Sequence, residues 1–346
     1  MSMISGKGAI IRGWALALSM LVVLPADGAK AETLTVHDKF DRTVTVEVPV
    51  KRAVLFDTYE LAATLGVWDR VSGLSRFAFA NDLVMATVPD AKTRFADVGT
   101  PVDVNVEALM ALKPDLVVTW DLNRAVVDYL SDKGLTVIAL HPESFEDVMT
   151  ALALEGRLFG AEAAAGRAEK EARKLMDFVR DRVATVSSSE RRRALWLVSR
   201  QNMVAGRSDV MSELLRTAGI TNVADEIQQR TSEVPLERIL SWNPDLLFVW
   251  GYSHADVGEI LGDPQWQQLT AVRNGAVRRG PRWSTASPRV APMTLWLAAT
   301  AYPQAFADVD VIARTDAFMQ ALYGVPYDRM NPLPQVGKSL AEGQKQ

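Results

Sequence analysis

The sequence contains no cysteine and only three histidines among its 346 residues. Without cysteine the chain forms no disulfide and has no thiolate for an iron–sulfur cluster. A lipid anchor on an N-terminal cysteine also needs that residue, so we expect none. The histidines, His37, His141 and His254, form no H-E-x-x-H pattern, and the sequence has no G-x-S-x-G or Walker pattern. We therefore expect no catalytic group and a protein that is not an enzyme.

Long apolar runs are missing as well. The first residues of the chain include the positively charged Lys7 and Arg12. The apolar run 14–24 follows, and residues 29–31 read A-K-A. This pattern predicts a signal peptide over 1–31. An uncleaved membrane anchor is the alternative, but the run is shorter than the about 20 residues that span a bilayer. Cleavage leaves 315 residues, enough for two domains.

The sequence has no basic tract. The precursor carries a net charge of −4 and the segment 1–31 carries +2, so the mature chain carries −6. This balance argues against nucleic acid as a partner. An exported protein without an anchor is expected in the periplasm, and we expect it to be a monomer.

One passage of 17 residues occurs twice, at 104–120 (VNVEALMALKPDLVVTW) and at 234–250 (VPLERILSWNPDLLFVW). The offset between the copies is 130 residues, which is the size of a whole α/β lobe. The identical pairs are Val104/Val234, Glu107/Glu237, Pro114/Pro244, Asp115/Asp245, Leu116/Leu246 and Trp120/Trp250. The repeat predicts two similar lobes, with a small-molecule site between them.

Periodicity predicts the elements of the first lobe. Residues 33–48 alternate apolar and polar, which indicates a hairpin with its turn near 38–41. Short buried strands are expected at 52–56, 67–74, 115–120 and 135–140. Thr58 is expected to cap a helix over 59–65 that ends at Gly66. Strands alternating with helices predict an α/β fold, with two Rossmann-like lobes that each have a parallel sheet.

Residues 144–188 have helical spacing, no proline and a break near Gly160. A helix over 161–186 would be about 39 Å long at about 1.5 Å per residue, so it can join the lobes. In the second lobe we expect a strand at 194–198, a helix ending at Gly219, a hairpin at Asn274–Gly275, a loop over 283–288 and a helix over 291–302. The expected divisions are 1–31 signal peptide, 32–158 N-terminal lobe, 159–190 connecting helix, 191–336 C-terminal lobe and 337–346 loose tail.

The chain resembles the class III periplasmic substrate-binding proteins of ABC importers, which serve ferric siderophores, haem and vitamin B12. The resemblance covers nearly all of the mature chain and depends on short segments in order. These segments are 51–54 (KRAV), 60–66 (ELAATLG), 105–117 (NVEALMALKPDLV), 218–223 (AGITNV) and 295–303 (LWLAATAYP). It implies two α/β lobes joined by one rigid helix, with only a small closing motion.

The resemblance also implies one exposed glutamate on each lobe, which pairs with arginines of the inner-membrane permease and its ATPase complex. The repeat places these glutamates at Glu107 and Glu237. Two carboxylates at a fixed separation can recognise two arginines by charge-assisted hydrogen bonds. The alternative is that each glutamate only favours the first turn of a helix through the helix dipole.

Ligands of such folds sit beyond the carboxyl ends of the strands, so the loops there carry the expected site. The expected ligand-binding residues are Tyr59, Arg76, Phe77, Trp120, Arg200, Trp250, Tyr252, His254, Arg282, Trp283 and Arg289. Aromatic rings supply stacking area, and arginines bind carboxylate or catecholate oxygens. The two tryptophans Trp120 and Trp250 could instead only close the ends of core strands.

We therefore predict capture of an iron complex, a ferric siderophore, and its delivery to the permease. We expect no cofactor and no resident metal. Haem is an alternative, with Tyr59, Tyr252 or His254 as iron ligand. A corrinoid is another. A molybdate-type oxyanion is a third, with Arg76, Arg282 and Arg289 as donors. A periplasmic metal-dependent enzyme is the least favoured reading.

Overall fold

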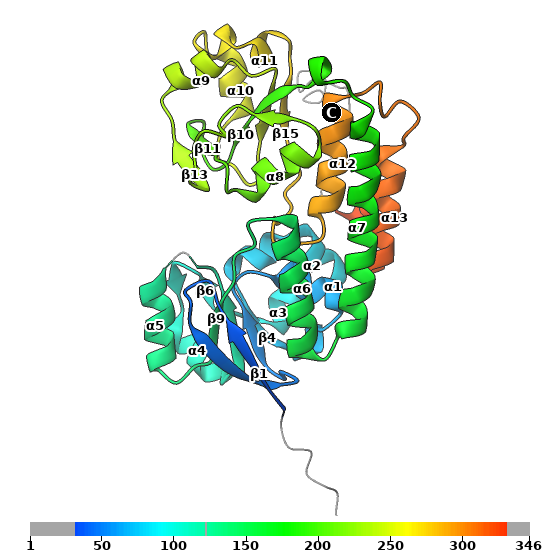
Figure 1. The fold of residues 1–346 in the computed structure, drawn as a ribbon. Coiled ribbons are helices and arrows are strands. Elements are labelled where there is room, and N and C mark those ends of the chain that lie inside the picture. Colours follow the sequence, from blue (N-terminus) through cyan, green and yellow to red (C-terminus); the bar gives the residue numbers. More distant parts are fainter. Residues whose placement is uncertain (1–31, 122, 331–346) are drawn as a thin grey trace, which may run out of the picture. The chain divides into compact units, whose positions relative to one another are not determined.

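The computed structural model describes residues 32–121 and 123–330, which Figure 1 shows as a ribbon. The expected signal peptide and the expected loose tail at 337–346 lie outside these residues. Within the described part of the chain, no helix is long and apolar enough to cross a bilayer.

The described chain begins with the hairpin that the alternating pattern predicts. Strands β1 (Glu32–His37) and β2 (Thr43–Val48) pair antiparallel. In the turn, the Asp38 carboxylate accepts hydrogen bonds from the backbone and the side chain of Arg42. The Arg42 guanidinium also donates to the carbonyl of Val137 at 2.8 Å, which fastens the hairpin to the first lobe.

Five short strands form a parallel sheet in the N-terminal lobe. In order across the sheet they are β5 (Ala96–Asp97), β4 (Val71–Leu74), β3 (Ala53–Leu55), β8 (Leu116–Thr119) and β9 (Val137–Ala139). A small antiparallel pair, β6 (Gly99–Thr100) and β7 (Asp103–Val104), follows β5. The helices are α1 (Tyr59–Leu65), α2 (Asp82–Thr87), α3 (Ala91–Arg94), α4 (Val106–Leu112), α5 (Arg124–Asp132) and α6 (Phe145–Phe159). The central strands β3 and β8 are buried apolar runs, as expected for a sheet covered on both faces.

The sheet of the C-terminal lobe is mixed. Its order is β13 (Thr231–Glu233), β11 (Met203–Ala205), β10 (Arg193–Leu197), β14 (Leu246–Val249) and β15 (Val277–Arg279), with β12 (Thr221–Asn222) also paired to β10. Strands β10, β12, β14 and β15 are parallel, whereas β11 and β13 run antiparallel to their neighbours. The loop 198–202 between β10 and β11 is too short for a parallel crossover, so β11 has to turn back. The helices are α8 (Val210–Thr217), α9 (Leu236–Trp242), α10 (Val257–Gly262) and α11 (Thr270–Arg273).

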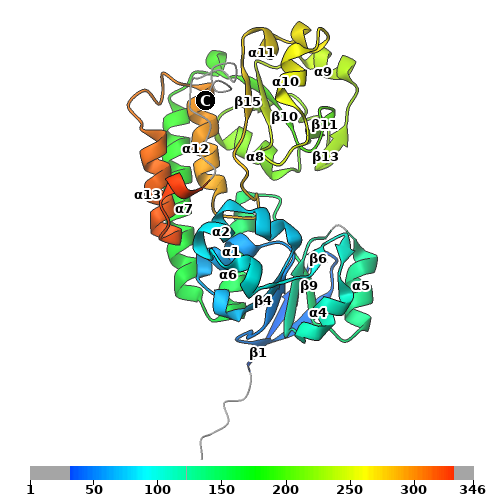
Figure 2. The same ribbon diagram turned by 180° about the vertical axis from the view of Figure 1, so that it is seen from behind.

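The helix expected over 161–186 is observed as α7 (Glu162–Ala184). Gly160, with φ of 65°, ends α6 and turns the chain into α7. Helices α12 (Val290–Ala301) and α13 (Val311–Tyr323) then pack along α7, as the two opposite views in Figures 1 and 2 show. The expected architecture of two α/β lobes joined by a long helix is therefore confirmed.

One apolar core continues from lobe to lobe. The same cluster of buried side chains includes Leu55 of β3, Met176 of α7, Trp196 of β10 and Trp296 of α12. Separate clusters fill the other face of each sheet, under α4 and α5 in the first lobe and under α9, α10 and α11 in the second. Because protein interiors are close-packed, a shared core resists large independent movements of the lobes.

The repeated passage forms the same structure in both lobes. Each copy is a helix, α4 or α9, that ends in the left-handed region at Lys113 or Asn243 and leads into a buried strand. The matching position of the aspartate in the two copies has a structural reason. The Asp115 carboxylate accepts the backbone N–H groups of residues 51 and 52 at 3.0 and 2.9 Å, and the Asp245 carboxylate accepts that of Arg193 at 2.9 Å. Each aspartate thus secures the start of the neighbouring strand.

Two local expectations are wrong. Asn274 and Gly275 do not form a hairpin: they end α11, with Gly275 at φ of 60°, and lead into β15. Thr58 stands at the N-terminal cap position of α1, but its side chain makes no capping hydrogen bond because its backbone is left-handed, with φ of 37°. A β-branched residue in that region is strained, and such strain persists only where the surroundings impose it.

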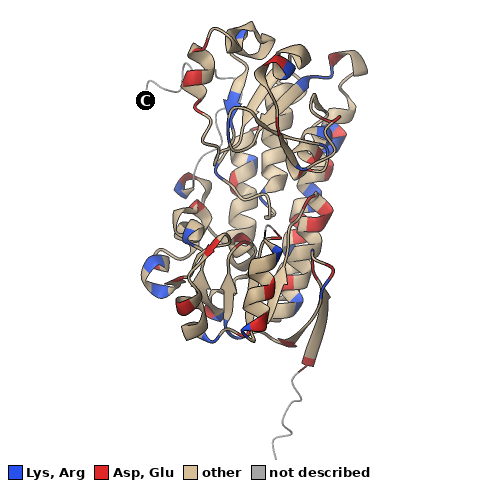
Figure 3. Cartoon of the chain, turned by 90° about the vertical axis from the view of Figure 1, so that its left-hand side faces the viewer, with Lys and Arg blue, Asp and Glu red and all other residues tan. Residues whose placement is uncertain are grey.

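Charged side chains of both signs are interspersed along both lobes, as the side view in Figure 3 shows. No block of a single sign dominates the face in that view. Recognition of a charged ligand therefore has to depend on individual residues rather than on a general field.

We predict that Asp245→Ala lowers the free energy of unfolding by about 1–2 kcal/mol, because the amide of Arg193 loses a charged acceptor. Asp115→Ala should cost a similar amount. Chemical denaturation followed by circular dichroism measures both. Asp128→Ala is the control, since Asp128 forms only an exposed pair with Arg124 one helical turn away, and it should cost less than about 0.5 kcal/mol. Equal losses in all three variants would contradict the structural role of the repeat.

Candidate functional site

The loops in which we expect the ligand site lie next to one another. Within each sheet the carboxyl ends of the parallel strands meet at one edge. Direct contacts join the two edges. The pairs are Asn81 with Tyr252, Glu60 with Ser284, and Asp121 with Arg230. We call this region the lobe junction.

Trp250, Tyr252 and Arg282 form one group at the junction. Trp250 directly follows β14, and its ring centroid lies 5.3 Å from that of Tyr252 in an edge-on arrangement. The Arg282 guanidinium carbon lies 5.2 Å from the centre of the Tyr252 ring. A Cβ added at Gly251 would lie 2.1 Å from the carbonyl oxygen of Pro281, so only glycine lets the loop with Arg282 approach this closely. Arg282 is exposed and pairs with no carboxylate of the described residues.

The Glu60 carboxylate is fully buried and is connected to Tyr252 through the side chain of Asn81. It accepts hydrogen bonds from the Asn81 amide at 2.7 Å, from the backbone of Ser284 at 3.1 Å and from Nε of Arg289 at 2.8 Å. Arg289 Nη2 donates to Glu60 as well, and Nη1 donates to Asp82 at 2.9 Å. The ion pair ties α1 and α2 of the first lobe to the segment that enters α12.

Two residues of the expected ligand site are fully buried. Trp283 and Arg289 each have an exposed fraction of 0%. The Arg289 guanidinium lies 5.1 Å from the Trp283 ring, and Trp283 also packs edge-on against Tyr327. Sequence reasoning correctly expects anionic partners for Arg289, but the structure provides them within the chain. Neither side chain is accessible to a ligand in this structure.

Arg200 and His254 lie apart from the group around Tyr252. Both are exposed and line a surface pocket of about 540 Å³ next to α9, together with Gln201, Asn202, Pro235, Leu236, Ala255, Glu259, Asp263, Gln265 and Trp266. The structure therefore divides the expected arginine-rich site into two places.

Arg76 and Phe77 follow β4 at the carboxyl edge of the first sheet. The Arg76 guanidinium pairs with Asp97 at 3.0 Å, and both side chains are largely exposed. Phe77 is 48% exposed, which is unusual for a large apolar side chain in a loop that leads directly to Asn81.

Trp120 and Tyr59 lie near two buried carboxyl groups. Burial raises the pKa of Asp57 to about 7, although a hydrogen bond from Trp120 opposes the rise. Burial likewise raises the pKa of Glu155 on α6 to about 8, and the charge of Asp57 adds to the effect. The strained Thr58 directly follows Asp57 in the chain, and its side chain lies close enough to Glu155 to oppose the rise in the pKa of that group. Tyr59 is buried, with its pKa raised well above the ordinary value by burial and by the charge of Asp57.

Sequence reasoning misses one cluster of charges at the junction. Arg230 of the C-terminal lobe donates to Asp121 at 3.3 Å and lies 3.6 Å from Glu143, both of the N-terminal lobe. His141 lies 3.4 Å from Asp121, and burial and the Arg230 charge lower its pKa. Asp121 lies in the loop at the carboxyl end of β8, so its position after a predicted strand could have marked it as a candidate site residue. Arg230 precedes an antiparallel strand, and no sequence signal marks it.

The described residues contain no group of three or more His, Asp or Glu side chains that could hold a metal ion. Of the three candidate haem ligands, Tyr59 is buried and lies close enough to Tyr252 at the junction for the two to interact electrostatically, whereas His254 lines the pocket beside α9.

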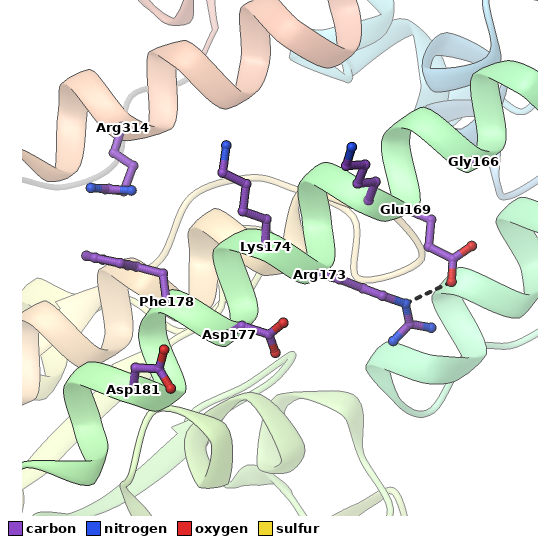
Figure 4. Close-up of a pocket in the computed structure, with 9 residues that line it drawn as sticks. Gly166, Glu169, Arg173, Lys174, Asp177, Phe178, Asp181 and Arg314 are labelled. Atoms are coloured by element: carbon purple, nitrogen blue, oxygen red, sulfur yellow. Dashed lines mark hydrogen bonds and ion pairs between the residues drawn. The ribbon is translucent and has the colours of Figure 1, made fainter.

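A second surface pocket lies along α7 and has a volume of about 720 Å³. Figure 4 shows its lining, with Arg314 of α13 over Phe178 and charged side chains of α7 on both sides. The lining residues are Gly166, Glu169, Lys170, Arg173, Lys174, Asp177, Phe178, Asp181 and Arg314. Cationic and carboxylate side chains are mixed there, and none of the strand-end loops contributes.

Glu107 and Glu237 occupy equivalent positions, each in the first turn of its helix and each exposed. Neither forms an ion pair with a described residue. Both side chains are thus available to cations outside the chain, one on each lobe.

The chain is similar in sequence to known binding proteins. The family model described as "Periplasmic binding protein" matches residues 58–282. The chain is 25% identical to the molybdate-binding protein MolA of Haemophilus influenzae over 84% of this chain and 91% of MolA. It is 27% identical to an uncharacterized ABC transporter substrate-binding lipoprotein, YvrC of Bacillus subtilis, over 85% of this chain and 97% of YvrC.

Among solved structures, CeuE of Helicobacter pylori with Ni(II) bound superposes with a TM-score of 0.77 at 25% identity. The match covers 86% of this chain and 98% of CeuE. The fold of the chain is thus similar to that of CeuE along nearly the whole length of both.

We predict that the free energy of unfolding falls as pH rises from about 5 to about 8.5. Buried Glu155 and Asp57 hold protons that the unfolded chain releases near its ordinary pKa values, so their contribution is complete at acid pH and lost as pH passes about 7 to 8. Glu155→Gln should reduce this dependence and stabilise the protein by about 2 kcal/mol at about pH 8.5. Thermal unfolding across pH measures the effect. Glu47→Gln, on exposed β2, is the control, and a wild-type pH profile in Glu155→Gln would refute the assignment.

Proposed function

Because the chain belongs to the periplasmic binding protein family, we propose that it is the substrate-binding protein of an ABC importer and acts in the periplasm. In this role it captures an iron complex of the ferric siderophore type at the lobe junction and delivers it to the permease and its ATPase. The relatives named above are binding proteins, which supports a role without turnover.

The group of Arg282, Tyr252 and Trp250 carries this proposal. An exposed arginine that pairs with no carboxylate of residues 32–121 and 123–330 lies against a tyrosine ring, where an anionic ligand gains both a charge-assisted bond and stacking area. The exposed ring of Phe77 at the edge of the other lobe favours a ligand with an organic shell, because a bare anion offers nothing for it to contact. A ferric complex with catecholate or carboxylate groups has both properties.

A molybdate-type oxyanion is the second candidate. The similarity to MolA over most of both chains favours it. Such a ligand needs only a small set of donors, which Arg282 and Tyr252 supply. It would leave Phe77 without a role.

We predict that Arg282→Ala weakens binding of a ferric tris-catecholate complex at least tenfold, because the complex loses a charge-assisted hydrogen bond. Phe77→Ala should weaken the same complex severalfold and leave molybdate unaffected. Titration calorimetry with each ligand measures these changes. Native mass spectrometry and a visible spectrum of protein from its own host identify the bound species.

Arg314→Ala on α13 is the matched control, since this arginine is exposed but distant from the strand ends. An iron charge-transfer band with the expected loss in Arg282→Ala supports the proposal. Tight binding of molybdate, without binding of the ferric complex, would favour the oxyanion as the ligand and contradict the siderophore assignment. A Soret or corrin spectrum in the host-purified protein contradicts the iron–siderophore assignment.

The exposed pair Glu107 and Glu237 supports docking to the permease. The two carboxylates stand at equivalent places on two lobes that share a core, so their separation is nearly fixed. Such a pair sets the orientation of a complex and speeds its encounter more than it adds affinity.

We predict that the double variant Glu107→Arg/Glu237→Arg abolishes ligand uptake by cells that carry the chain with its own permease, while ligand affinity stays at the wild-type value. The two reversed charges repel arginines on the permease. Glu162→Arg is the control, because Glu162 is also exposed in the first turn of a helix, α7. Uptake at the wild-type rate in the double variant would contradict a docking role for the two glutamates.

A further inference from the structure

The hydrogen bonds of Asn81 have only one possible direction. This side chain is fully buried between the lobes. Its nitrogen lies 2.7 Å from the Glu60 carboxylate, and its oxygen accepts the backbone N–H of Val84 at 3.1 Å. A carboxylate can only accept and a backbone N–H can only donate. The amide orientation is therefore determined, since the reverse orientation would break both bonds.

This orientation determines the role of the Tyr252 hydroxyl. The same Asn81 nitrogen lies 3.2 Å from the hydroxyl oxygen of Tyr252, so Asn81 donates and Tyr252 accepts. The hydroxyl proton of Tyr252 is then not used in this bond. No described residue accepts it. The Tyr252 O–H is a donor that remains available at the lobe junction.

We propose that Tyr252 recognises the ligand as a neutral hydrogen-bond donor, aimed by Asn81, and does not bind a metal ion as a phenolate. The inference rests on the proposed function for the identity of the site. It adds the specificity rule of that site: the ligand must present an acceptor oxygen beside the Arg282 guanidinium. A complex that needs a tyrosinate to complete its coordination does not fit.

The surroundings of Tyr252 agree with this role. Burial and the negative charge of Glu60 raise the pKa of Tyr252 above its ordinary value, and they outweigh the opposing charge of Arg289. A phenolate at this place would stand near the buried Glu60 and the partly buried Asp82, both held by Arg289. Like charges at close range disfavour ionisation. Arg282 above the ring then provides the positive charge for the ligand oxygen that the hydroxyl contacts.

Asn81 is accordingly a positioning residue. It touches the Tyr252 hydroxyl, the Glu60 carboxylate and, through its oxygen, the start of α2. These bonds hold the Asn81 amide in place, and the amide in turn fixes the position of the Tyr252 hydroxyl oxygen. The ligand therefore meets a hydrogen-bond donor whose position is fixed before binding. Preorganised donors of this kind discriminate against ligands that lack the matching acceptor, because the buried group is then left unpaired.

A ligand-free measurement tests the ionisation state. Difference absorbance near 295 nm between wild type and Tyr252→Phe reports the phenolate of Tyr252 alone. No phenolate signal is expected from neutral pH up to about pH 10, the ordinary range for tyrosine. Tyr129→Phe, at an exposed tyrosine of α5, is the matched control variant for the difference measurement. A phenolate of Tyr252 with a midpoint below about 10 overturns the proposal.

A binding measurement tests the donor role, with a ferric tris-catecholate complex and sodium molybdate as probes. Quenching of tryptophan fluorescence reports binding, because Trp250 packs on Tyr252. Tyr252→Phe should raise Kd of the bound probe about tenfold. Asn81→Ala should raise it less, and the double variant should match Tyr252→Phe, since Asn81 acts through the hydroxyl.

Proton release distinguishes a donor from a metal ligand. Calorimetry in buffers of different ionisation enthalpy counts the protons released on binding. Wild type and Tyr252→Phe should release the same number. A release that is larger by about one proton in wild type, or an unchanged affinity in Tyr252→Phe, overturns the inference. Wild-type protein that binds neither probe contradicts the proposed ligand classes instead, and the ligand-free titration still decides the state of Tyr252.

Discussion

The buried ion pair between Arg289 and Glu60 is the contact on which the junction depends. Arg289 uses its guanidinium on Glu60 and Asp82, and Glu60 in turn accepts the amide of Asn81 and the backbone of Ser284. A buried pair of this kind adds little net stability, because desolvation offsets the attraction. Breaking it is costly, since the remaining charge has no water around it. The pair therefore specifies how the loop before α12 meets α1 and α2.

Two kinds of contact hold the lobes together, a shared apolar core and the polar contacts at the strand ends, and the ion pair belongs to the second kind. The shared apolar core along α7 and α12 restricts how far the lobes can move. The polar contacts at the strand ends determine which side chains face each other when they are close. A protein built in this way is suited to hold a ligand by small adjustments of side chains. The strained backbone of Thr58 and two nearby buried carboxyl groups, whose pKa values burial raises, belong to the same region.

Arginines at the strand ends take two different roles, although they look alike in the sequence. Arg289 is internal and satisfied, whereas Arg282 is exposed and lies on an aromatic ring. The difference follows from their neighbours in space. Arg289 stands one residue before α12, in the segment that packs against the N-terminal lobe, and two carboxylates of that lobe enclose it. Arg282 stands where Gly251 allows the loop to approach Tyr252.

The sequence by itself determined the fold class, the repeat and the long connecting helix, because these depend on periodicity, on Gly160 and on the spacing of 130 residues between the two passages. The repeat also predicted matched positions for Glu107 and Glu237, and the structure shows both in the exposed first turn of a helix. Only the tertiary structure decided which arginines are buried, that Arg230 reaches Asp121, and that Asn81 directs Tyr252. Those outcomes depend on contacts between residues more than 100 positions apart, and no local pattern encodes which carboxylate a given arginine will meet.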